Sequence, residues 1–416
     1  MKVAVVYQYY QGHQAPGHSL VFELTQHLAG QGHEVTVVSG ETGYMQADPA
    51  VLPWYRRLLR RERDGAVKVI RTFTYTQLHR SYSGRLLSFI SFSLSAPLGL
   101  LGLRRPDVVL ASSPPIFPMF STWLVCKLRG IPLVLEVRDL WPESAVQMGI
   151  LRNRLLISVM SWMERLLYNQ AVRIVALTTG IRDDIVARGW PAEKLQVVTC
   201  GVDRDMLFTD LPAGQRIRRQ LGWQDCHIVL YLGAMGEANN LDVVLDAARQ
   251  SHGKPVRYLL IGDGMRKPCI QARAQALGLD NVLILPPIPK DQARAYINAA
   301  DLCVVTLLDI PLFRGAIPTK LLDYMACARP VLCGVAGEAG QIVKAAGAGL
   351  NFSANDGQHL AELIEQLRHD PEKCLLMGRR GQAYVREHFD AAVNRRAMEQ
   401  LLLDSCRVAL KAPASG

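Results

Sequence analysis

Short apolar runs alternate with longer amphipathic stretches along most of the chain. The short runs, rich in Val, Ile and Leu, predict buried β-strands, and stretches with apolar residues three or four positions apart predict helices. In the first half the predicted strands are 3–7, 34–39, 67–73, 107–112, 133–138, 174–178 and 196–199, and the predicted helices include 19–29, 117–128 and 155–168. In the second half the predicted strands are 227–232, 258–261, 282–285, 302–306 and 331–333, with helices at 241–249, 269–277 and 292–299. This alternation predicts an α/β protein whose parallel sheets are covered by helices on both faces.

The two runs of alternating elements meet near Gly201-Val202-Asp203, and the polar stretch 209–219 follows. We therefore predict two doubly wound domains, 1–200 and 201–390, which face each other across a cleft. From Pro371 the pattern is helical nearly to the end, and we expect a last helix at about 391–411 to pack back on the first domain. Ligands of doubly wound sheets bind beyond the carboxyl ends of the strands. The loops at those ends therefore carry the candidate chemistry.

Composition fits a globular protein that is long enough for two cores. The 416 residues are 49% hydrophobic and 20% charged, and the nine cysteines form no C-x-x-C pair. Free, mostly buried thiols indicate a reducing compartment. The first residues predict a strand and lack the layout of a signal peptide, so we expect a cytoplasmic location.

Positive charge is concentrated in one segment. Residues 51–105 hold eleven Lys and Arg against Glu62 and Asp64, a net charge of +9 out of +10 for the whole chain. Trp54 and Tyr55 precede the arginines, and 86–103 carries no charge. Basic, aromatic and apolar elements together favour an anionic membrane surface over nucleic acid as the partner of 54–105. We therefore predict peripheral attachment to the inner face of the cytoplasmic membrane.

The uncharged stretch 86–103 lies at the lower limit of length for a transmembrane helix. Serines, Pro97 and two glycines interrupt it, and small residues share one helical face, which suits close packing against protein. We predict a core helix or an interfacial helix rather than a membrane span, and the pattern leaves those two alternatives open.

Residues 314–326 follow a predicted strand and begin a helix near Pro318, with Thr319 as the candidate cap. The free N–H groups of such a helix start bind anions. Lys320 adds a positive charge, and Asp323, one turn later, is placed to accept hydrogen bonds from a pair of hydroxyl groups. A nucleoside diphosphate with its ribose requires these groups. The alternative is an ordinary strand-to-helix connection with a solvated lysine.

Other loops at predicted strand ends are individually weak signals. They are 11–18, which contains His13, Gly17 and His18, then 233–236 and 262–267. None matches G-x-G-x-x-G or the P-loop, which disfavours a nicotinamide enzyme or a nucleoside triphosphatase. Asp203-Arg204-Asp205 reads D-x-D but lies at the domain junction, where we interpret it as structural, so no metal site is predicted.

The chain resembles glycosyltransferase family 4. Members of this family are retaining enzymes, and their GT-B fold consists of two Rossmann-like domains. A further stretch, 137–144, resembles a subgroup that builds bacterial O-antigen and capsular polysaccharide. The matching segments are Gly32-His33-Glu34-Val35-Thr36-Val37, Gly201-Val202-Asp203 with Phe208, Ile261-Gly262-Asp263-Gly264, Ala300-Asp301-Leu302 and 318–326.

The resemblance implies transfer of a sugar from a nucleoside diphosphate sugar, UDP-linked and of a hexose or N-acetylhexosamine type, without a cofactor or metal. It implies a lipid-linked (polyprenyl diphosphate) or oligosaccharide acceptor on the first domain and the donor on the second. The implied donor contacts are Gly17, Gly236, Asn239, Arg266, Ile288, Gly315, Thr319, Lys320 and Asp323, and the candidate acceptor contacts are His13, His18 and Glu143. His13 and His18 are equally suited to hydrogen bonds within their own loop. The candidate catalytic residues are Asp139 and Arg138.

The chain departs from the family pattern at charged positions. Gly315 and Asp323 occupy the two positions of the family's Glu-x7-Glu motif, and the family's diphosphate-binding Arg and Lys fall near Ala234 and Asn239. We therefore expect Arg266 and Lys320 to bind the diphosphate. The position of the family's catalytic histidine is held by Arg138, so Arg138 and Asp139 become the candidates for an organiser and an acceptor-side base.

Two other classes stay open on these residues. A GT-B sugar-nucleotide epimerase would bind the same donor. Its substrate is soluble, so it would not need a basic membrane-binding segment such as 54–105, which argues mildly against this class. A non-catalytic sugar-nucleotide-binding partner subunit is the other alternative, because several charged motif residues are missing.

Overall fold

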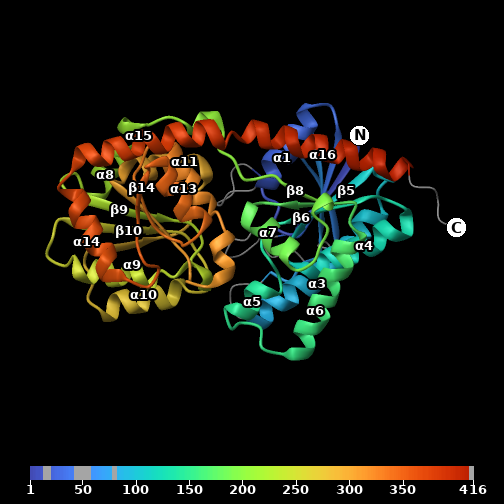
Figure 1. The fold of residues 1–416 in the computed structure, drawn as a ribbon, viewed down its shortest axis with the longest axis horizontal. Helices are drawn as coiled ribbons and strands as arrows, with labels where there is room; N and C mark the ends of the chain where they lie inside the picture. Colours follow the sequence, from blue (N-terminus) through green and yellow to red (C-terminus); the bar gives the residue numbers. More distant parts are fainter. Residues whose placement is uncertain (13–19, 42–57, 77–81, 412–416) are drawn as a thin grey trace. The chain divides into compact units, whose positions relative to one another are not determined.

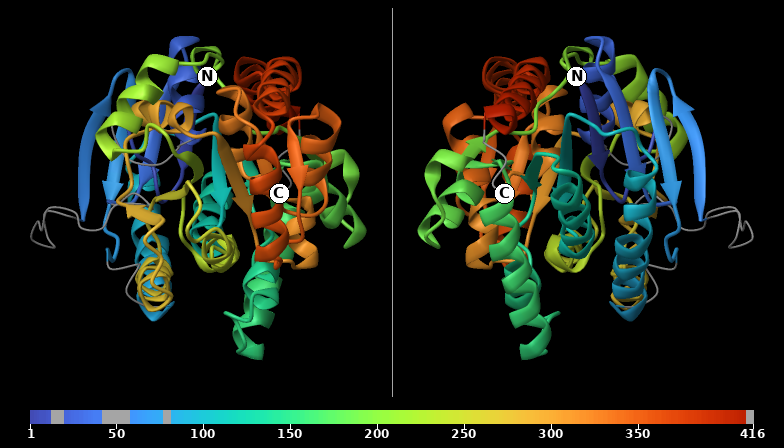
Figure 2. Two further views of the ribbon diagram at one scale, coloured as in Figure 1. Left: turned by 90° about the vertical axis from the view of Figure 1, so that its left-hand side faces the viewer. Right: turned by 90° about the vertical axis from the view of Figure 1, so that its right-hand side faces the viewer.

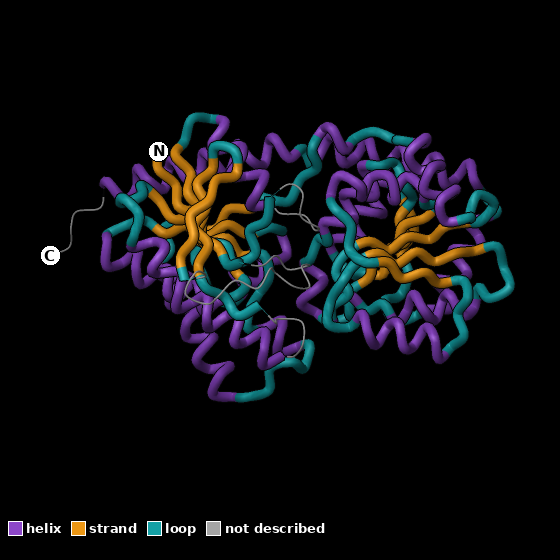
Figure 3. Tube along the Cα trace, turned by 180° about the vertical axis from the view of Figure 1, so that it is seen from behind, coloured by secondary structure: helices purple, strands orange, loops and turns teal. Residues whose placement is uncertain are grey.

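A computed structural model describes residues 1–12, 20–41, 58–76 and 82–411, and it divides into two compact units (Figure 1). Unit 1 comprises Met1–Thr199 together with Asn394–Gly416, and unit 2 comprises Cys200–Val393. In each unit the strands gather into one sheet with helices around it (Figure 3).

The sheet of unit 1 has eight strands in the order β3-β4-β2-β1-β5-β6-β7-β8. Every neighbouring pair is parallel except β3 and β4, which are antiparallel and lie at one margin (Figure 2). The strands are β1 (Lys2–Val6), β2 (Glu34–Ser39), β3 (Leu59–Asp64), β4 (Val67–Thr72), β5 (Val108–Ser113), β6 (Leu133–Val137), β7 (Arg173–Ala176) and β8 (Leu195–Val197). The helices are α1 (Leu20–Gly30), α3 (Tyr82–Leu101), α4 (Ile116–Arg129), α5 (Glu143–Gln147), α6 (Arg154–Gln170), α7 (Thr179–Ala187), η1 (Ala192–Lys194) and most of α16 (Ala391–Lys411).

The sheet of unit 2 has six parallel strands in the order β11-β10-β9-β12-β13-β14. These are β9 (His227–Leu232), β10 (Val256–Ile261), β11 (Val282–Leu285), β12 (Leu302–Thr306), β13 (Val331–Gly334) and β14 (Gly349–Asn351). The helices are η2 (Arg204–Met206), α8 (Leu211–Leu221), η3 (Glu237–Asn239), α9 (Asp242–Gln250), α10 (Lys267–Ala276), α11 (Lys290–Ala299), η4 (Pro311–Gly315), α12 (Thr319–Ala326), α13 (Glu338–Ala346), α14 (Gly357–Arg368) and α15 (Pro371–His388). The predicted fold class, parallel sheets covered by helices, is confirmed.

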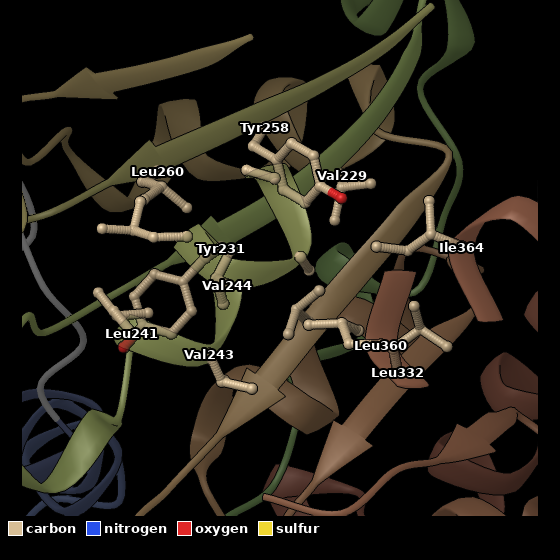
Figure 4. Close-up of a cluster of buried hydrophobic side chains, with 14 of the residues drawn as sticks. Val229, Tyr231, Leu241, Val243, Val244, Tyr258, Leu260, Leu332, Leu360 and Ile364 are labelled. Carbon is tan, nitrogen blue, oxygen red and sulfur yellow. The ribbon is translucent and has the colours of Figure 1, made fainter. Parts of the chain in front are cut away.

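Each unit has its own apolar core. In unit 2 the core joins one face of β9 and β10 to α9 and α14, and Figure 4 shows part of it, including Tyr258, Leu332 and Ile364. In unit 1 the strands pack on α1 and on α16, which contributes Leu401 and Leu402. Fully burying one such apolar side chain contributes ~1.5–3 kcal/mol to the free energy of folding. The apolar strands therefore stay in the register that keeps these side chains in the core.

Helix α3 has two different faces. One face lies on the sheet: Ser88 and Ser95 are buried, and a Cβ on Gly99 would come 2.9 Å from Val38. The opposite face exposes a row of large apolar side chains three or four residues apart, at Leu87, Ile90, Leu94, Leu98 and Leu101. Residues Ser83–Leu101 are long and apolar enough to cross a membrane by length and composition alone, and 44% of that window is buried in the protein. The helix is therefore part of the core on one side and exposed on the other.

The strand orders place a topological switch point in each sheet. In unit 1 the order reverses between β1 and β5, and in unit 2 it reverses between β9 and β12. In doubly wound sheets the loops leave the carboxyl ends of the two strands at a switch point in opposite directions, and ligands bind between them.

Candidate functional site

Two glycine-containing loops lie side by side at the carboxyl edge of the unit 2 sheet. Gly262 and Gly264 adopt φ values of +154° and +155°, which other residues rarely adopt. A Cβ on Gly262 would overlap the carbonyl of Gly233, and one on Gly264 would overlap that of Met235. The N–H of Arg266 donates to the Met235 carbonyl at 3.0 Å. Glycine thus lets the loops after β9 and β10 meet backbone to backbone.

Lys320, in the first turn of α12, reaches the end of β9 at the switch point. Its Nζ lies 2.6 Å from the Tyr231 hydroxyl and 3.8 Å from the centre of that ring. A Cβ on Gly233 would come 2.9 Å from the same nitrogen. Burial lowers the pKa of the Lys320 ammonium to about 7. This switch point therefore carries a cation that burial destabilises and that an anion would stabilise.

Two tyrosines hold Lys320 and α12 in place. Tyr231 is fully buried at the margin of the core, beside Leu241 (Figure 4), and its hydroxyl donates to the Ala234 carbonyl. From α12 itself, the Tyr324 hydroxyl accepts from the Leu232 N–H at 2.8 Å. Tyr231 and Tyr324 were not among the predicted site residues. Tyr231 could have been noticed in the sequence, since it places a phenol inside an otherwise apolar strand. A buried hydroxyl group needs a hydrogen-bond partner, so such a residue indicates a polar contact at that point.

Other predicted donor residues of unit 2 already have partners in the protein. The Asn239 side chain accepts from the Gly236 N–H at 3.1 Å and so closes the loop after β9. Arg266 donates to Asp242 at 2.7 Å, and its Nε lies 3.7 Å from Glu237. The positive charge of Arg266 is thus balanced by two carboxylates, whereas no ion pair in the described part of the chain involves Lys320.

The start of α12 differs from the prediction in one respect. Thr319 does not cap the helix: Pro318 holds the N-cap position with extended backbone, and its carbonyl accepts from the Leu321 N–H at 2.9 Å. Thr319 is instead the first helical residue, because the extended Pro318 already ends the preceding loop. Asp323 follows Lys320 by three positions, so both lie on one side of the helix.

The last two predicted donor residues in unit 2 also lie at the carboxyl edge of this sheet. Gly315 ends η4, in the connection from β12 to α12, and Ile288 is half-buried in the loop after β11.

Arg138 lies at the switch point of unit 1. Its N–H donates to the Ser113 carbonyl at 2.9 Å, which holds the end of β6 against β5, and its guanidinium lies 5.2 Å from the ring centre of Tyr7, just after β1. Below it, Nε is 3.5 Å from the buried carboxylate of Glu136, which accepts from Ser112 at 2.5 Å. Sequence reasoning missed Glu136, although a carboxylate within the apolar run of β6 was a visible signal.

Asp139 closes the turn that follows β6. Its carboxylate accepts from the Ser144 hydroxyl at 3.1 Å, and its carbonyl accepts from the Trp141 N–H at 3.1 Å. Burial raises the pKa of the Asp139 carboxyl, opposed by the hydrogen bonds from Ser144 and the Leu140 backbone and by the charge of Arg85. A carboxyl with a raised pKa is suited to proton transfer, and the same contacts also serve the turn.

Of the predicted acceptor residues, the structure describes only Glu143. Glu143, the first residue of α5, accepts from Gln147 at 2.9 Å. His13, Gly17 and His18 lie outside the described residues. Within the described ranges, no group of three or more His, Cys, Asp or Glu side chains is arranged to hold a metal ion.

Two family models match the chain, one in each half. Residues 18–201 match a glycosyl transferase 4-like domain, and residues 214–384 match the glycosyl transferases group 1 domain. The chain is a GT-B glycosyltransferase of family 4. The glycosyltransferase is 24% identical to the colanic acid biosynthesis glycosyl transferase WcaI of Escherichia coli over 322 residues, 73% of this chain and 76% of that protein. It is 25% identical to the glycosyltransferase WbjE of Pseudomonas aeruginosa over 312 residues, 69% of this chain and 74% of that one.

The fold of the glycosyltransferase is also found in a solved structure, that of HepE of Anabaena in complex with UDP-glucose. The two chains superimpose with a TM-score of 0.72 and 18% identity, covering 97% of this chain and 100% of HepE. Each switch point of the glycosyltransferase thus presents a cation: Lys320 against the Tyr231 phenol in unit 2, and Arg138 above a buried carboxylate in unit 1.

Proposed function

We propose that this glycosyltransferase moves a sugar from a nucleoside diphosphate sugar to a lipid-linked (polyprenyl diphosphate) or oligosaccharide acceptor during synthesis of bacterial cell-surface polysaccharide. The observation that carries the proposal is the half-buried ammonium of Lys320 at the unit 2 switch point, which donates to the Tyr231 hydroxyl and forms no ion pair among the described residues. The name of WcaI refers to colanic acid biosynthesis, and HepE was solved with UDP-glucose, which supports a polysaccharide product and a UDP-linked hexose or N-acetylhexosamine donor.

The chemistry requires departure of a nucleoside diphosphate from the anomeric carbon. Negative charge develops on the leaving phosphate oxygen, and fixed N–H groups and a cation stabilise it; losing one such group typically costs ~10²–10³ in rate. In the proposed retaining mechanism, the acceptor oxygen attacks from the face that the diphosphate leaves. The new bond joins this oxygen to the anomeric carbon, and the acceptor proton passes to the leaving phosphate. No metal is invoked.

The unit 1 site is proposed to hold the acceptor. Arg138, fixed by Glu136 and Tyr7, organises the polar edge of this site, and Asp139 contacts the attacking hydroxyl. Because Glu136 balances the charge of Arg138, this site suits a neutral hydroxyl group.

A binding and transfer panel tests the proposal. UDP-, GDP- and dTDP-sugars are titrated by calorimetry, and each donor that binds is assayed for transfer to polyprenyl diphosphate-linked and free oligosaccharide acceptors. We expect a UDP-sugar to bind best and its sugar to appear on an acceptor with the anomeric configuration kept. Conversion of the donor to its epimer without transfer would instead identify an epimerase, and tight binding without any turnover would identify a non-catalytic subunit.

We also propose peripheral attachment to the cytoplasmic membrane through 54–105. Within it, Trp54, Tyr55 and the first arginines lie outside the described residues, so the exposed face of α3 carries the structural argument. Leu94 is 74% exposed in the middle of that face. Helices α4 and α6 lie on the same side of the unit 1 sheet as α3 (Figures 1 and 2) and add the exposed Leu128 and Trp162. An exposed apolar surface with this much adjacent positive charge suits an anionic bilayer.

Co-sedimentation with vesicles tests the attachment. Leu94→Ser should weaken binding to anionic vesicles, because it removes an apolar side chain from the surface that enters the interface. Leu375→Ser is the matched control, since Leu375 is similarly exposed on α15 of unit 2. Equal binding of both variants and the parent protein would show that α3 does not touch the membrane.

A further inference from the structure

A hollow of about 650 Å³ opens at the amino-terminal edge of the unit 1 sheet. Ala4, Thr36 and Ile70 contribute to its wall from β1, β2 and β4, and the loop that follows α3 closes one side through Leu103 and Pro106. Because β1 and β6 run parallel, this hollow and Arg138 lie at opposite edges of the sheet. The hollow is therefore separate from the site described above.

Positive charge dominates the lining. Of the described residues, it contains two carboxylates, Glu34 and Glu62, against five cations, which are Lys2, Arg61, Arg63, Lys68 and Arg104. Glu34 accepts from Lys68 at 2.6 Å, and Glu62 accepts at 2.6 Å from Arg71, which is not part of the lining. Both carboxylates are thus engaged.

The other four lining cations are not in direct ion-pair contact with a carboxylate of the described residues, although Lys2 and Arg104 add to the effect of Lys68 in lowering the pKa of Glu34. In the described ranges no ion pair joins Lys2, Arg61, Arg63 or Arg104 to an acidic side chain, and all four are exposed. The antiparallel register places Arg61 opposite Ile70 and Arg63 opposite Lys68, so these two arginines share one face of β3. Arg60 lies on the opposite face of β3 and is not part of the lining. Its guanidinium donates to the Glu62 carboxylate at 3.3 Å.

The negative end of α3, which adjoins the hollow, is also neutralised. Arg129 donates to the Leu100 carbonyl at 2.8 Å and to the Leu103 carbonyl at 2.9 Å, and the Leu100 carbonyl also accepts from the Leu103 N–H at 3.2 Å, so both carbonyls at this helix end are engaged. An anion entering the hollow therefore meets unpaired cations rather than exposed carbonyl oxygens.

We propose that this hollow binds the phosphate-bearing headgroup of an anionic membrane lipid. The proposal rests on the membrane attachment proposed above and names the site that selects the lipid. Leu98 and Leu101, on the last turn of α3, are 52% and 53% exposed next to the loop that closes the hollow, so apolar side chains adjoin the cation cluster. Among the described residues, the lining holds no aromatic ring on which a base would stack, which favours a lipid over nucleic acid.

Single charge changes on β3 provide matched test variants. Arg63→Gln removes a lining cation, and Arg60→Gln removes the same charge three residues away on the opposite face. Partition onto phosphatidylglycerol-containing vesicles should fall about fivefold for Arg63→Gln, as expected for one cation near an anionic leaflet. It should fall less than twofold for Arg60→Gln, and partition onto neutral phosphatidylcholine vesicles should be weak for all three proteins. Both side chains are exposed, so equal melting temperatures are expected.

Further arms of the experiment separate the alternatives. Equal losses for the two variants would show diffuse attraction and overturn the site. If soluble glycerol phosphate binds as tightly as the vesicles and responds to the same variant, a soluble ligand is indicated and the lipid assignment is wrong. Binding of a DNA duplex that depends on Arg63 but not Arg60 would overturn it in favour of nucleic acid. Transfer to a water-soluble acceptor should be unchanged in Arg63→Gln, so failure of the proposed transfer reaction is scored independently.

Discussion

Replacing Lys320 with Met should make the protein more stable and less able to bind its donor. Met has a similar length and no charge, so it fills the same space beside Tyr231 without a buried ammonium. The folded protein holds Lys320 with a pKa of about 7, against an ordinary value of 10.5. At 1.36 kcal/mol per pKa unit, this shift corresponds to at most about 4 kcal/mol of destabilisation at pH 7.

Two effects reduce the expected gain in unfolding free energy. The ammonium contacts the ring of Tyr231, which stabilises a desolvated cation by ~2 kcal/mol, and Met leaves the Tyr231 hydroxyl without one of its partners. We therefore expect Lys320→Met to raise the unfolding free energy by about 2 kcal/mol at pH 7. Lys254→Met, in the bend that precedes β10 and so at the opposite edge of the same sheet, is the control and should have little effect.

The pH dependence provides a sharper test of the same reasoning. Between pH 7 and 10.5 the unfolded chain keeps the Lys320 proton that the folded chain has lost, so this lysine makes stability rise with pH across that window. The advantage of Lys320→Met should therefore shrink as pH rises, as measured by urea unfolding at several pH values. Donor affinity of the parent protein should fall above pH 7 by up to tenfold per pH unit, because the diphosphate binds the protonated form. A variant less stable than the parent at pH 7, or an affinity independent of pH, would refute the reasoning.

Three further predictions concern the other site residues. Asp323→Asn should weaken donor binding and reduce discrimination between ribose and deoxyribose donors in calorimetry, and an unchanged ratio would contradict the ribose contact. Asp139→Asn should lower transfer far more than donor binding; a loss matched by Ser144→Ala together with a fall in melting temperature would instead assign Asp139 to the turn. Glu136→Gln should remove the charge that balances Arg138 and lower transfer at least tenfold while leaving donor affinity intact, as ~1.4 kcal/mol of lost positioning would do. Unaltered transfer would show that Glu136 serves folding alone.

The central strands were predictable because they are buried on both faces and therefore apolar throughout. The predicted bounds of β2, β9, β11 and β12 agree with the structure. Strand β3 was missed because its sequence, LRRERD, has no apolar face: it pairs through its backbone at the sheet margin. Strand β14 has only three residues, beginning with Gly349, and so left no apolar pattern to detect.

The position of the candidate site followed from topology, but its internal contacts did not. Parallel sheets bring all carboxyl-end loops to one edge, which placed Lys320 and Arg266 near the same crevice from the sequence alone. The partner of Lys320 is Tyr231, which lies 89 residues earlier in the chain. No local pattern links such a pair, and none indicated that Arg266 is already bound to Asp242.

The two switch-point cations differ in what lies beneath them, and the difference matches the two substrates proposed. Arg138 rests on a buried carboxylate, Glu136, so its site is close to neutral before any ligand arrives. Lys320 rests on a neutral phenol, Tyr231, and no carboxylate in the described part of the chain pairs with it. A half-buried cation without a counter-ion is unfavourable until an anion binds, and that anion then gains more than it would in water. The unit 2 site is therefore suited to a diphosphate, and the unit 1 site to the uncharged hydroxyl that attacks it.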